Sequence, residues 1–218
     1  TLDGKIATAR GESQWITGEP ARAYGMELRR DADAILVGIN TILADDPRLT
    51  WRTPQTATRH PKMLRRIVLD SQARTPLQAR IVSDAQAVLT TIVVSRQAPR
   101  KRVAALAQRV RVLVAPLKKS VPHSFRTALD LRWLLRRLGA ENITHLLVEG
   151  GGEVNASFLL QRLAHRVAFF YAPKILGGRD ARKAVGGEGA RTLTEAIRLR
   201  DIHWRRLGDD LLLEAAVD

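Results

Sequence analysis

A carboxylate, a run of glycines and a helical pattern follow one another between residues 146 and 163. The apolar run 146–148 has the length of a buried strand, ends at Glu149, and is followed by three glycines at 150–152. Apolar residues then recur at Ala156, Leu159, Leu160 and Leu163, which is the spacing of one helix face. A strand, a glycine turn and a helix in this order bring unpaired N–H groups to the positive end of a helix dipole. The stretch therefore predicts an anion-binding turn with a carboxylate beside it.

This turn departs from the usual dinucleotide-binding fingerprint. Counting from Gly150 and Gly152, the third glycine of that fingerprint would fall at Asn155. A tight turn that only packs a helix against a strand is the alternative interpretation. Glu149 favours a ligand site, because open α/β sheets bind their ligands at the carboxyl ends of the strands.

Composition limits the class of protein. The 218 residues are 45% hydrophobic, so we expect a single domain over residues 1–218, with two small domains as the alternative. The absence of cysteine excludes disulfides and thiolate ligands and indicates a reducing, cytoplasmic location. No apolar run approaches the roughly 20 residues of a membrane span, so no membrane partner is expected. The five histidines lack the spacing of metal ligands, so no metal site is expected.

The charge predicts an anionic ligand. Lysine and arginine number 36 against 22 acidic residues, a net charge of +14, which attracts polyanions. An RNA-binding protein is one interpretation. Only 5% of the residues are aromatic, however, and no aromatic side chains alternate with the basic ones to stack bases. We therefore expect a small phosphorylated ligand and no nucleic acid.

The pattern along the chain alternates strands with helices. Strands are expected at 5–9, 33–38, 66–70, 90–95, 110–115, 146–148 and 166–172. Helices are expected at 18–31, 42–44, 99–108 and 127–139, besides the one after the glycine turn, and surface loops at 53–62 and 175–189. The helix at 127–139 opens with a capping-box-like start, Thr127 to Asp130, and a hairpin is expected around 208–210. This order indicates a largely parallel sheet covered on both faces, with an antiparallel edge.

Three groups of motifs carry a family resemblance. They are residues 2–7 with 13–17, residues 33–38 with Thr41 and 45–52, and residues 147–151. In this order they resemble the pyrimidine reductase of riboflavin biosynthesis, the C-terminal half of the bifunctional deaminase-reductase. The resemblance implies an α/β fold similar to dihydrofolate reductase. Its three layers are a central, largely parallel mixed sheet with helices on both faces, and it ends in a C-terminal antiparallel hairpin.

The resemblance also implies a reaction. NADPH would reduce 5-amino-6-(5-phosphoribosylamino)uracil at the ribose C1′ to the ribitylamino compound, in a homodimer and without a metal. The zinc deaminase signature requires cysteine, so the deaminase activity lies outside this chain. The lack of an initiator methionine suggests that a linked deaminase domain was removed. The alternatives are a reductase of the undeaminated diamino-pyrimidinone or of a pterin-like compound, and a non-catalytic nucleotide- or RNA-binding protein.

Substrate contacts follow from the matching motif positions. The resemblance assigns this role to Ser13, Arg29, Leu49, Arg52 and Glu149. Arg29 and Arg52 suit the 5′-phosphate, because a guanidinium can donate two parallel bonds to it. Glu149 suits N–H groups of the pyrimidine, because an ionised carboxylate only accepts. The alternatives are a solvated helix face for Arg29 and an ion pair at a strand end for Glu149.

Cofactor contacts are implied in the same way. They are Trp15, Thr41, Asp45, Ser71, Gly151, Gly152, Glu153, Val154, Asn155, Ala156 and Ser157. Lys5 is the cation that we place near the reacting sugar, as an acid or an electrostatic aid, with Glu149 as the second catalytic group. The alternatives are a core position for Trp15, a helix end for Asp45 and a surface position for Lys5.

Two finer expectations concern the cofactor. Ser95 and Arg96 follow a strand and could contact the 2′-phosphate that distinguishes NADPH from NADH. By analogy with dihydrofolate reductases, one peptide bond among Gly150, Gly151 and Gly152 is expected to be cis.

Overall fold

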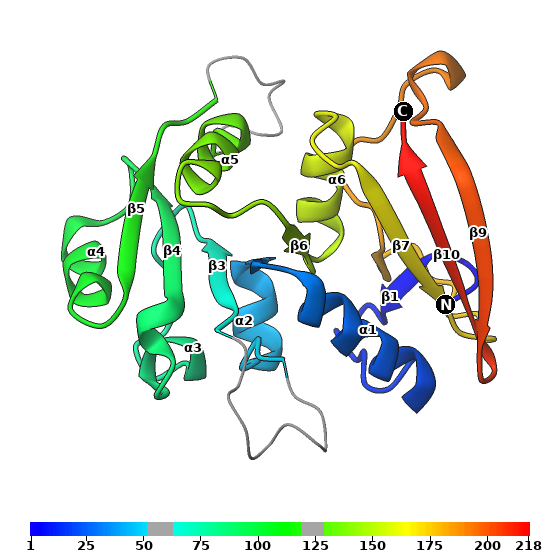
Figure 1. Cartoon of the computed structure of the whole chain (residues 1–218), viewed down its shortest axis with the longest axis horizontal. Coiled ribbons are helices and arrows are strands. Elements are labelled where there is room, and N and C mark those ends of the chain that lie inside the picture. Colours follow the sequence, from blue (N-terminus) through cyan, green and yellow to red (C-terminus); the bar gives the residue numbers. More distant parts are fainter. Residues whose placement is uncertain (52–62, 119–128) are drawn as a thin grey trace. The chain divides into compact units, whose positions relative to one another are not determined.

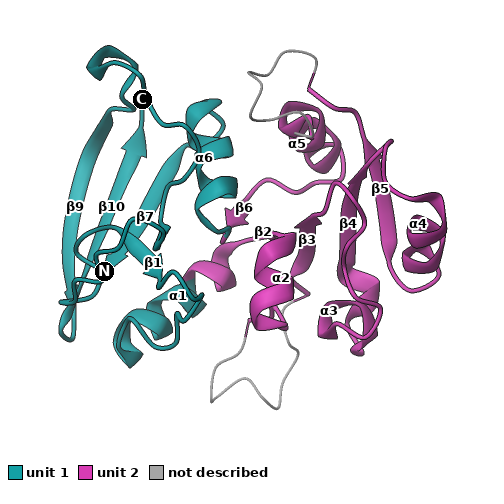
Figure 2. Ribbon diagram, turned by 180° about the vertical axis from the view of Figure 1, so that it is seen from behind, with its two compact units in different colours: residues 1–27, 150–218 teal, residues 28–149 magenta. Residues whose placement is uncertain are grey.

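The computed structural model describes residues 1–51, 63–118 and 129–218, which fall into two compact units (Figures 1 and 2). Unit 1 contains Thr1–Glu27 and Gly150–Asp218, and unit 2 contains Leu28–Glu149. The chain leaves unit 1 after Glu27 and re-enters it at Gly150, directly after Glu149. The loop expected at 53–62 lies outside the described residues.

Unit 2 is built on a five-stranded parallel sheet in the order β5-β4-β3-β2-β6. The strands are β2 (Ala34–Gly38), β3 (Arg65–Leu69), β4 (Thr90–Ser95), β5 (Arg111–Ala115) and β6 (Leu146–Val148). Every residue of β2 and β4 is buried, as expected of central parallel strands covered on both faces. β6 is only half-buried, because it is an edge strand. The predicted parallel sheet is confirmed.

Helices connect these strands. They are α2 (Ile39–Asp45), α3 (Arg80–Ser83), α4 (Arg100–Ala107) and α5 (Leu131–Gly139), with a 3₁₀ helix at Ala87–Leu89. The register of the predicted capping box is wrong. Asp130 is itself the N-cap of α5, and its carboxylate accepts a hydrogen bond from the Trp133 amide at 2.9 Å.

The strand order defines a topological switch point in unit 2. After β2 the chain continues outward through β3, β4 and β5, and then β6 pairs with the opposite side of β2. Connections that diverge in this way leave a crevice at the carboxyl ends of the two strands, where α/β sheets bind ligands. In this chain those ends are Gly38 and Val148.

A fully buried arginine is paired inside this unit. The Arg66 side chain on β3 donates to both carboxylate oxygens of Asp84, at 2.8 and 2.9 Å, and to the Thr90 hydroxyl at 2.9 Å. Burial alone would raise the pKa of Asp84, but the hydrogen bonds and charge of Arg66 outweigh it and lower that pKa. The charge of Arg66 is thus satisfied inside the protein.

A cluster of charged residues links the N-terminal ends of β3 and β5. Glu141, after α5, accepts hydrogen bonds from Arg111 to each of its oxygens and one from Arg65, all at 2.6 Å. The bonds from Arg111 are the largest cause, with Arg65 adding to them, of a Glu141 pKa lowered to about 2. Glu141 therefore links β3, β5 and the end of α5.

Unit 1 contains antiparallel strands. β7 (Arg166–Tyr171), β10 (Asp210–Val217) and β9 (Leu199–Leu207) form a three-stranded sheet in the order β7-β10-β9. The expected hairpin is confirmed, and Gly208 in its turn has φ +66°. These strands make a sheet of their own and not an edge of the parallel sheet.

Two short strands and the remaining helices complete unit 1. β1 (Lys5–Ala7) pairs with β8 (Arg182–Lys183), which lies in the segment expected to be a loop. α6 (Gly152–Leu160) follows the glycine turn, and a 3₁₀ helix spans Leu193–Glu195. α1 (Glu19–Asp31) begins in unit 1 and ends in unit 2. In the part of the chain described, no helix combines the length and the apolarity that a membrane span requires.

Two expectations for the glycine turn are wrong. Leu160 is 39% exposed and Leu163 follows the end of α6, whereas Phe158 is buried beside Ala156 and Leu159. Within the described ranges, the only cis peptide bond joins Gln14 to Trp15, so the bonds among residues 150–152 are trans.

Candidate functional site

The carboxylate expected to contact the substrate is already bound to an arginine. Arg29, in the last turn of α1, donates from Nε to Glu149 Oε1 at 2.7 Å and from Nη2 to Oε2 at 2.6 Å. Arg29 Nη1 also donates to the Thr50 carbonyl at 3.1 Å, and the side chain is only 15% exposed. Arg29 is therefore not on a solvated helix face, and the ion-pair alternative for Glu149 is what the structure contains.

The ion pair with Arg29 leaves some hydrogen-bond acceptor positions of Glu149 unused. Two oxygens provide about four acceptor positions, and Arg29 uses one on each oxygen. The Glu149 side chain remains 31% exposed. A bidentate guanidinium fixes the orientation of the carboxylate, and the positions that Arg29 leaves unused can still accept N–H groups from a ligand.

The switch point brings Glu149 and α2 to neighbouring strand ends. The Glu149 amide donates to the Leu36 carbonyl at 2.9 Å, so Glu149 continues the pairing of β6 with β2. α2 begins directly after β2 and carries Thr41, which is half-buried, in its first turn. Asp45 is the exposed last residue of α2, as its helix-end interpretation predicts.

Leu49 and Ser71, which were predicted to contact substrate and cofactor, have structural roles in unit 2. Leu49 is 3% exposed within the hydrophobic core, with φ +50°, so its side chain is not available to a ligand. The Ser71 carbonyl, after β3, accepts hydrogen bonds from the Ser95 amide and hydroxyl at 3.1 and 2.8 Å. Ser95 is 2% exposed and its hydroxyl is used by the Ser71 carbonyl, whereas Arg96 is exposed, so the contact with the 2′-phosphate stays a prediction. Arg52 lies outside the described residues.

In unit 1, steric constraints explain the glycine turn. A side chain at Gly150 would collide with Val154, and one at Gly152 would collide with the Lys183 carbonyl. A side chain at Gly151 would meet nothing within 4 Å, so the backbone there is open to approach. The Val154 amide already donates to the Gly151 carbonyl at 3.0 Å. The two amides before it, at 152 and 153, precede the regular intrahelical pattern, so Gly151 and these two residues are the part of the turn that can bind an anion.

The segment after β8 covers the other side of this turn. The Gly186 amide donates to the Gly152 carbonyl at 2.9 Å, and the Asn155 side chain donates to the Ala184 carbonyl at 2.9 Å. Glu153 accepts from the Gly187 amide at 3.1 Å. The side chains of Asn155 and Glu153 therefore hold the segment 184–187 against the helix.

The last two residues that were predicted to contact the cofactor, Ala156 and Ser157, have structural roles within α6. Ala156 is fully buried, and the Ser157 hydroxyl donates to the Glu153 carbonyl at 2.8 Å. Any contact of this segment with a cofactor is therefore expected from backbone amides near Gly151 and not from these side chains.

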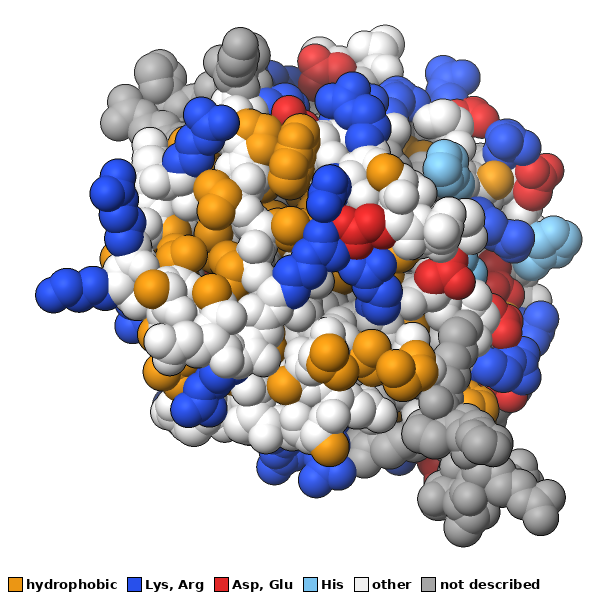
Figure 3. All heavy atoms as spheres, turned by 60° about the vertical axis from the view of Figure 1, so that its left-hand side comes forward, with side chains coloured by type: hydrophobic (Ala, Val, Ile, Leu, Met, Phe, Trp, Pro, Cys, Tyr) orange, Lys and Arg blue, Asp and Glu red, His pale blue; other side chains and the backbone are white. Residues whose placement is uncertain are grey.

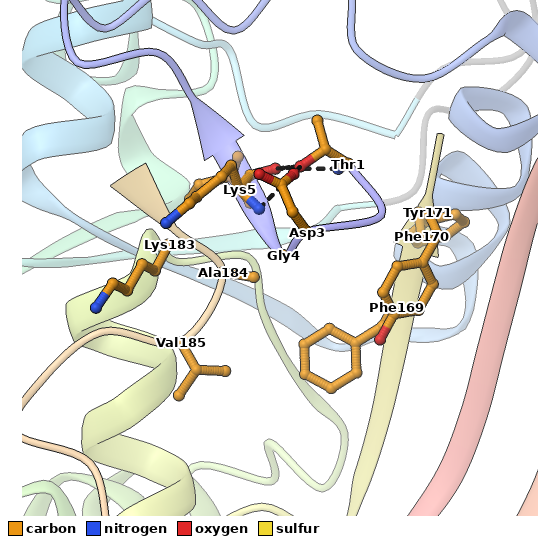
Figure 4. Close-up of a pocket in the computed structure, with 11 residues that line it drawn as sticks. Thr1, Asp3, Gly4, Lys5, Phe169, Phe170, Tyr171, Lys183, Ala184 and Val185 are labelled. Atoms are coloured by element: carbon orange, nitrogen blue, oxygen red, sulfur yellow. Dashed lines mark hydrogen bonds between the residues drawn. The ribbon is translucent and has the colours of Figure 1, made fainter. Parts of the chain in front are cut away.

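Lys5 lines a cavity of about 430 Å³ in unit 1 (Figure 4). It lies opposite Lys183 in the β1–β8 pair, and the two side chains extend to the same side. Phe169 and Tyr171 from β7 line the cavity as well. Like charges directly opposite each other are destabilising, so the cavity suits an anionic or electron-rich ligand group. The sequence did not indicate Lys183, because its strand has only two residues.

Trp15 is 65% exposed, so its core alternative is wrong. The Arg22 guanidinium lies 4.6 Å from the centre of its ring. Lys174 donates to the carbonyls of Trp15 and Ile16 at 3.1 and 2.8 Å, which fixes the backbone of this loop. Ser13, half-buried, lies two residues earlier.

Basic side chains are distributed and not gathered on the face drawn in Figure 3. Among the coloured atoms, lysine and arginine alternate with hydrophobic and acidic side chains. Within the described residues, no group of three or more His, Asp or Glu side chains is placed to hold a metal ion.

The fold and these features define a class, the pyrimidine reductases with a dihydrofolate-reductase-like fold. The family model described as RibD C-terminal domain matches residues 1–213, and the chain belongs to this family. It is 45% identical over 217 residues to the 2,5-diamino-6-ribosylamino-4(3H)-pyrimidinone 5′-phosphate reductase of Methanothermobacter thermautotrophicus, covering all of this chain and 94% of that protein.

The RibD relatives match over part of their length. The riboflavin biosynthesis protein RibD of Actinobacillus pleuropneumoniae is 39% identical over 217 residues, which are 54% of its length. The structure of Acinetobacter baumannii RibD superimposes on the whole chain with a TM-score of 0.77 at 25% identity. The match covers 56% of the Acinetobacter protein. The chain thus spans about half the length of the RibD proteins. The predicted fold class and family are confirmed.

Proposed function

We propose that the protein reduces 2,5-diamino-6-ribosylamino-4(3H)-pyrimidinone 5′-phosphate to its ribitylamino counterpart, with NADPH as the reductant. The observation that carries this proposal is the 45% identity to a reductase named for this substrate, over nearly the full length of both chains. The undeaminated compound, an alternative in the sequence analysis, thereby replaces the deaminated uracil as the preferred substrate.

The chemistry of Glu149 supports this preference. In the diamino compound, the ring N3–H and the 2-amino group are adjacent and present two donors side by side. In the deaminated compound, a carbonyl oxygen replaces the 2-amino group, so one donor faces the carboxylate beside an acceptor. A carboxylate only accepts, and leaving a polar group mispaired in a buried site costs about 1–3 kcal/mol. Glu149 therefore favours the diamino compound.

Arg29 orients the carboxylate that recognises the pyrimidine. Its two hydrogen bonds hold the carboxylate plane of Glu149, so that the unused acceptor positions keep a fixed direction. Alignment of two bound ligands is the main contribution that a protein makes to hydride transfer. We assign Arg29 to positioning. Its predicted contact with the 5′-phosphate remains a prediction, as does that of Arg52.

The chain's residues also fit a dinucleotide. Gly151 leaves the backbone open where the first amides of α6 are free, and Gly150 and Gly152 allow the close packing behind it. A phosphate at such a helix start is stabilised by N–H groups and by the helix dipole. When bound, NADPH supplies the hydride that is added to C1′. Lys5, in our proposal, stabilises the sugar oxygen released when the C1′–O4′ bond opens, by donating a proton or through its charge.

The test is turnover of the purified chain. NADPH consumption is measured with the diamino compound, the deaminated compound and dihydrofolate at equal concentrations. The proposal predicts the highest kcat/KM for the diamino compound and none for dihydrofolate. A higher value for the deaminated compound would contradict the substrate assignment. NADPH binding without turnover of any of them would instead support a non-catalytic nucleotide-binding protein. Sedimentation of the same sample tests the expected homodimer.

A further inference from the structure

Lys174 holds the loop that carries Trp15. Residues 15–18 precede α1 and form neither a helix nor a strand. The Lys174 ammonium, three residues after β7, donates to the carbonyls of Trp15 and Ile16 at 3.1 and 2.8 Å. Because an ammonium has several donors, one side chain fixes two consecutive peptide groups. We call residues 15–18 the Trp15 loop.

Side chains from two other elements hold the rest of the Trp15 loop. Arg22 of α1 donates from Nη1 to the Thr17 carbonyl at 2.7 Å. The Gly18 amide donates to the carboxylate of Asp210, a buried residue at the start of β10, at 2.7 Å. The indole of Trp15 stays largely exposed, with the Arg22 guanidinium over its ring. One face of the indole is thus covered by a cation, and the other can stack on a planar group.

The segment 174–177 also binds the stretch before Lys5. Two of its amides, at 176 and 177, donate to the two oxygens of the Asp3 carboxylate at 3.3 and 2.7 Å. In return, the Leu2 amide donates to the Lys174 carbonyl at 2.9 Å. Asp3 and Lys5 line the same cavity (Figure 4). One short segment therefore positions both the Trp15 loop and the start of β1.

We propose that Lys174 is a positioning residue for the nicotinamide ring of NADPH, which stacks on the open face of Trp15. The inference rests on the proposed function, because it assumes a hydride donor and places Lys5 beside the sugar carbon that is reduced. Hydride transfer requires the donor ring to lie against that carbon. An aromatic ring that is joined to the Lys5 strand therefore suits the nicotinamide and not the adenosine end of the cofactor.

Lys174 contributes by ordering the loop before the cofactor binds. A loop without this support samples several backbone conformations, and binding must then restrict them to one. With two carbonyls bound to the ammonium, the backbone of Trp15 already has the conformation in which the indole is presented. Lys174 is itself exposed, so water can replace its hydrogen bonds, and its loss should affect the affinity for the cofactor more than the stability of the fold.

The test is binding of NADPH and of the half-cofactor 2′,5′-ADP by titration calorimetry on the intact chain. Lys174→Met keeps the stem but removes the donors. It should weaken NADPH about fivefold to thirtyfold and change 2′,5′-ADP little. Lys174→Arg, which can still donate to two carbonyls, should recover most of the loss. Arg179→Ala removes an exposed cation from the same stretch of chain and is the matched control, with affinities like those of wild type.

A double-mutant cycle shows whether Lys174 acts through the indole. In a Trp15→Ala background, Lys174→Met should change the affinity for NADPH less than twofold, because the ring that it positions is already gone. Equal losses with and without Trp15 would contradict the positioning role. Urea denaturation should show Lys174→Met to be about as stable as wild type, and a large loss of stability would make Lys174 a structural residue and overturn the inference.

The outcomes separate this inference from the proposed function. An unchanged affinity for NADPH in Lys174→Met would overturn the inference and leave the reductase assignment intact. Equal losses in Arg179→Ala would do the same, because net charge alone would then act. Equal losses for 2′,5′-ADP would remove the nicotinamide from the site. Failure of wild type to bind NADPH would overturn the inference and the choice of cofactor together.

Discussion

The guanidinium of Arg29 and the carboxylate of Glu149, 120 residues apart in the chain, are joined by two hydrogen bonds of 2.7 and 2.6 Å. The pair lies at the carboxyl end of β6, next to the switch point of the parallel sheet. Glu149 is the last residue of unit 2, and the glycine turn of unit 1 follows it directly. Substrate recognition in our account depends on how firmly this carboxylate is held.

Loss of the arginine should impair the reaction without affecting the cofactor. Arg29→Ala removes both bonds to Glu149 and should lower kcat/KM for the diamino compound about tenfold to a hundredfold. NADPH affinity, followed by fluorescence, should stay near the wild-type value. Arg29→Lys, which keeps the charge but cannot bond in a bidentate way, should fall between the two. An unchanged kcat/KM in Arg29→Ala would show that Glu149 needs no support.

Replacing the carboxylate by an amide should change the choice of substrate. Gln presents one acceptor and one donor, so Glu149→Gln matches the carbonyl and N3–H of the deaminated compound better. The ratio of kcat/KM values, diamino over deaminated, should fall about tenfold or more. Glu149→Ala, which lacks either group, is the control and should lose activity on both compounds. A ratio that Glu149→Gln leaves unchanged would remove Glu149 from the base-recognition role.

Adjacent glycines should respond differently to the same substitution. Gly152→Ala places a methyl group against the Lys183 carbonyl and should lower the free energy of unfolding by about 1–3 kcal/mol. In Gly151→Ala the new methyl group faces open space, so the variant should be as stable as wild type. It should bind NADPH more weakly, because the methyl group obstructs the approach to the first amides of α6. Urea denaturation and NADPH titration of both variants separate the effects. Equal stability losses would contradict the steric account.

The Glu141 cluster should make part of the stability depend on pH. Bonds from Arg111 and Arg65 lower the pKa of Glu141 to about 2, below its ordinary value of 4.5. A lowered carboxyl pKa stabilises the folded state fully above 4.5, and this contribution is lost as the pH falls towards 2. Glu141→Gln should therefore be less stable than wild type at neutral pH, and the difference should shrink near pH 2. A constant difference in urea denaturation across this range would argue against the assignment.

The parallel sheet could be predicted from the sequence because its strands are apolar runs. β2 and β4 consist of residues that suit burial on both faces. Glycines mark two of the element ends, since Gly150 lies two residues after β6 and Gly139 is the last residue of α5. β8 could not be predicted, since Arg182 and Lys183 carry no strand pattern and are ordered only by pairing with β1. Short strands made by distant segments leave no local signal.

Site residues were predictable by type, and their partners were not. The motifs pointed to Glu149 and Arg29 separately, but only the fold brings the two together and uses the first acceptor positions of the carboxylate. The same holds for Arg66, whose burial depends on Asp84 and Thr90 from other elements.

The most direct test of the central claim is a competition between the two pyrimidines. Equal amounts of the diamino and deaminated phosphoribosylamino compounds are mixed with the protein and limiting NADPH, and the two ribitylamino products are counted by mass spectrometry. The product ratio equals the ratio of kcat/KM values and is independent of enzyme concentration. Our account predicts an excess of the diamino product of about tenfold or more. Equal amounts, or an excess of the deaminated product, would contradict it.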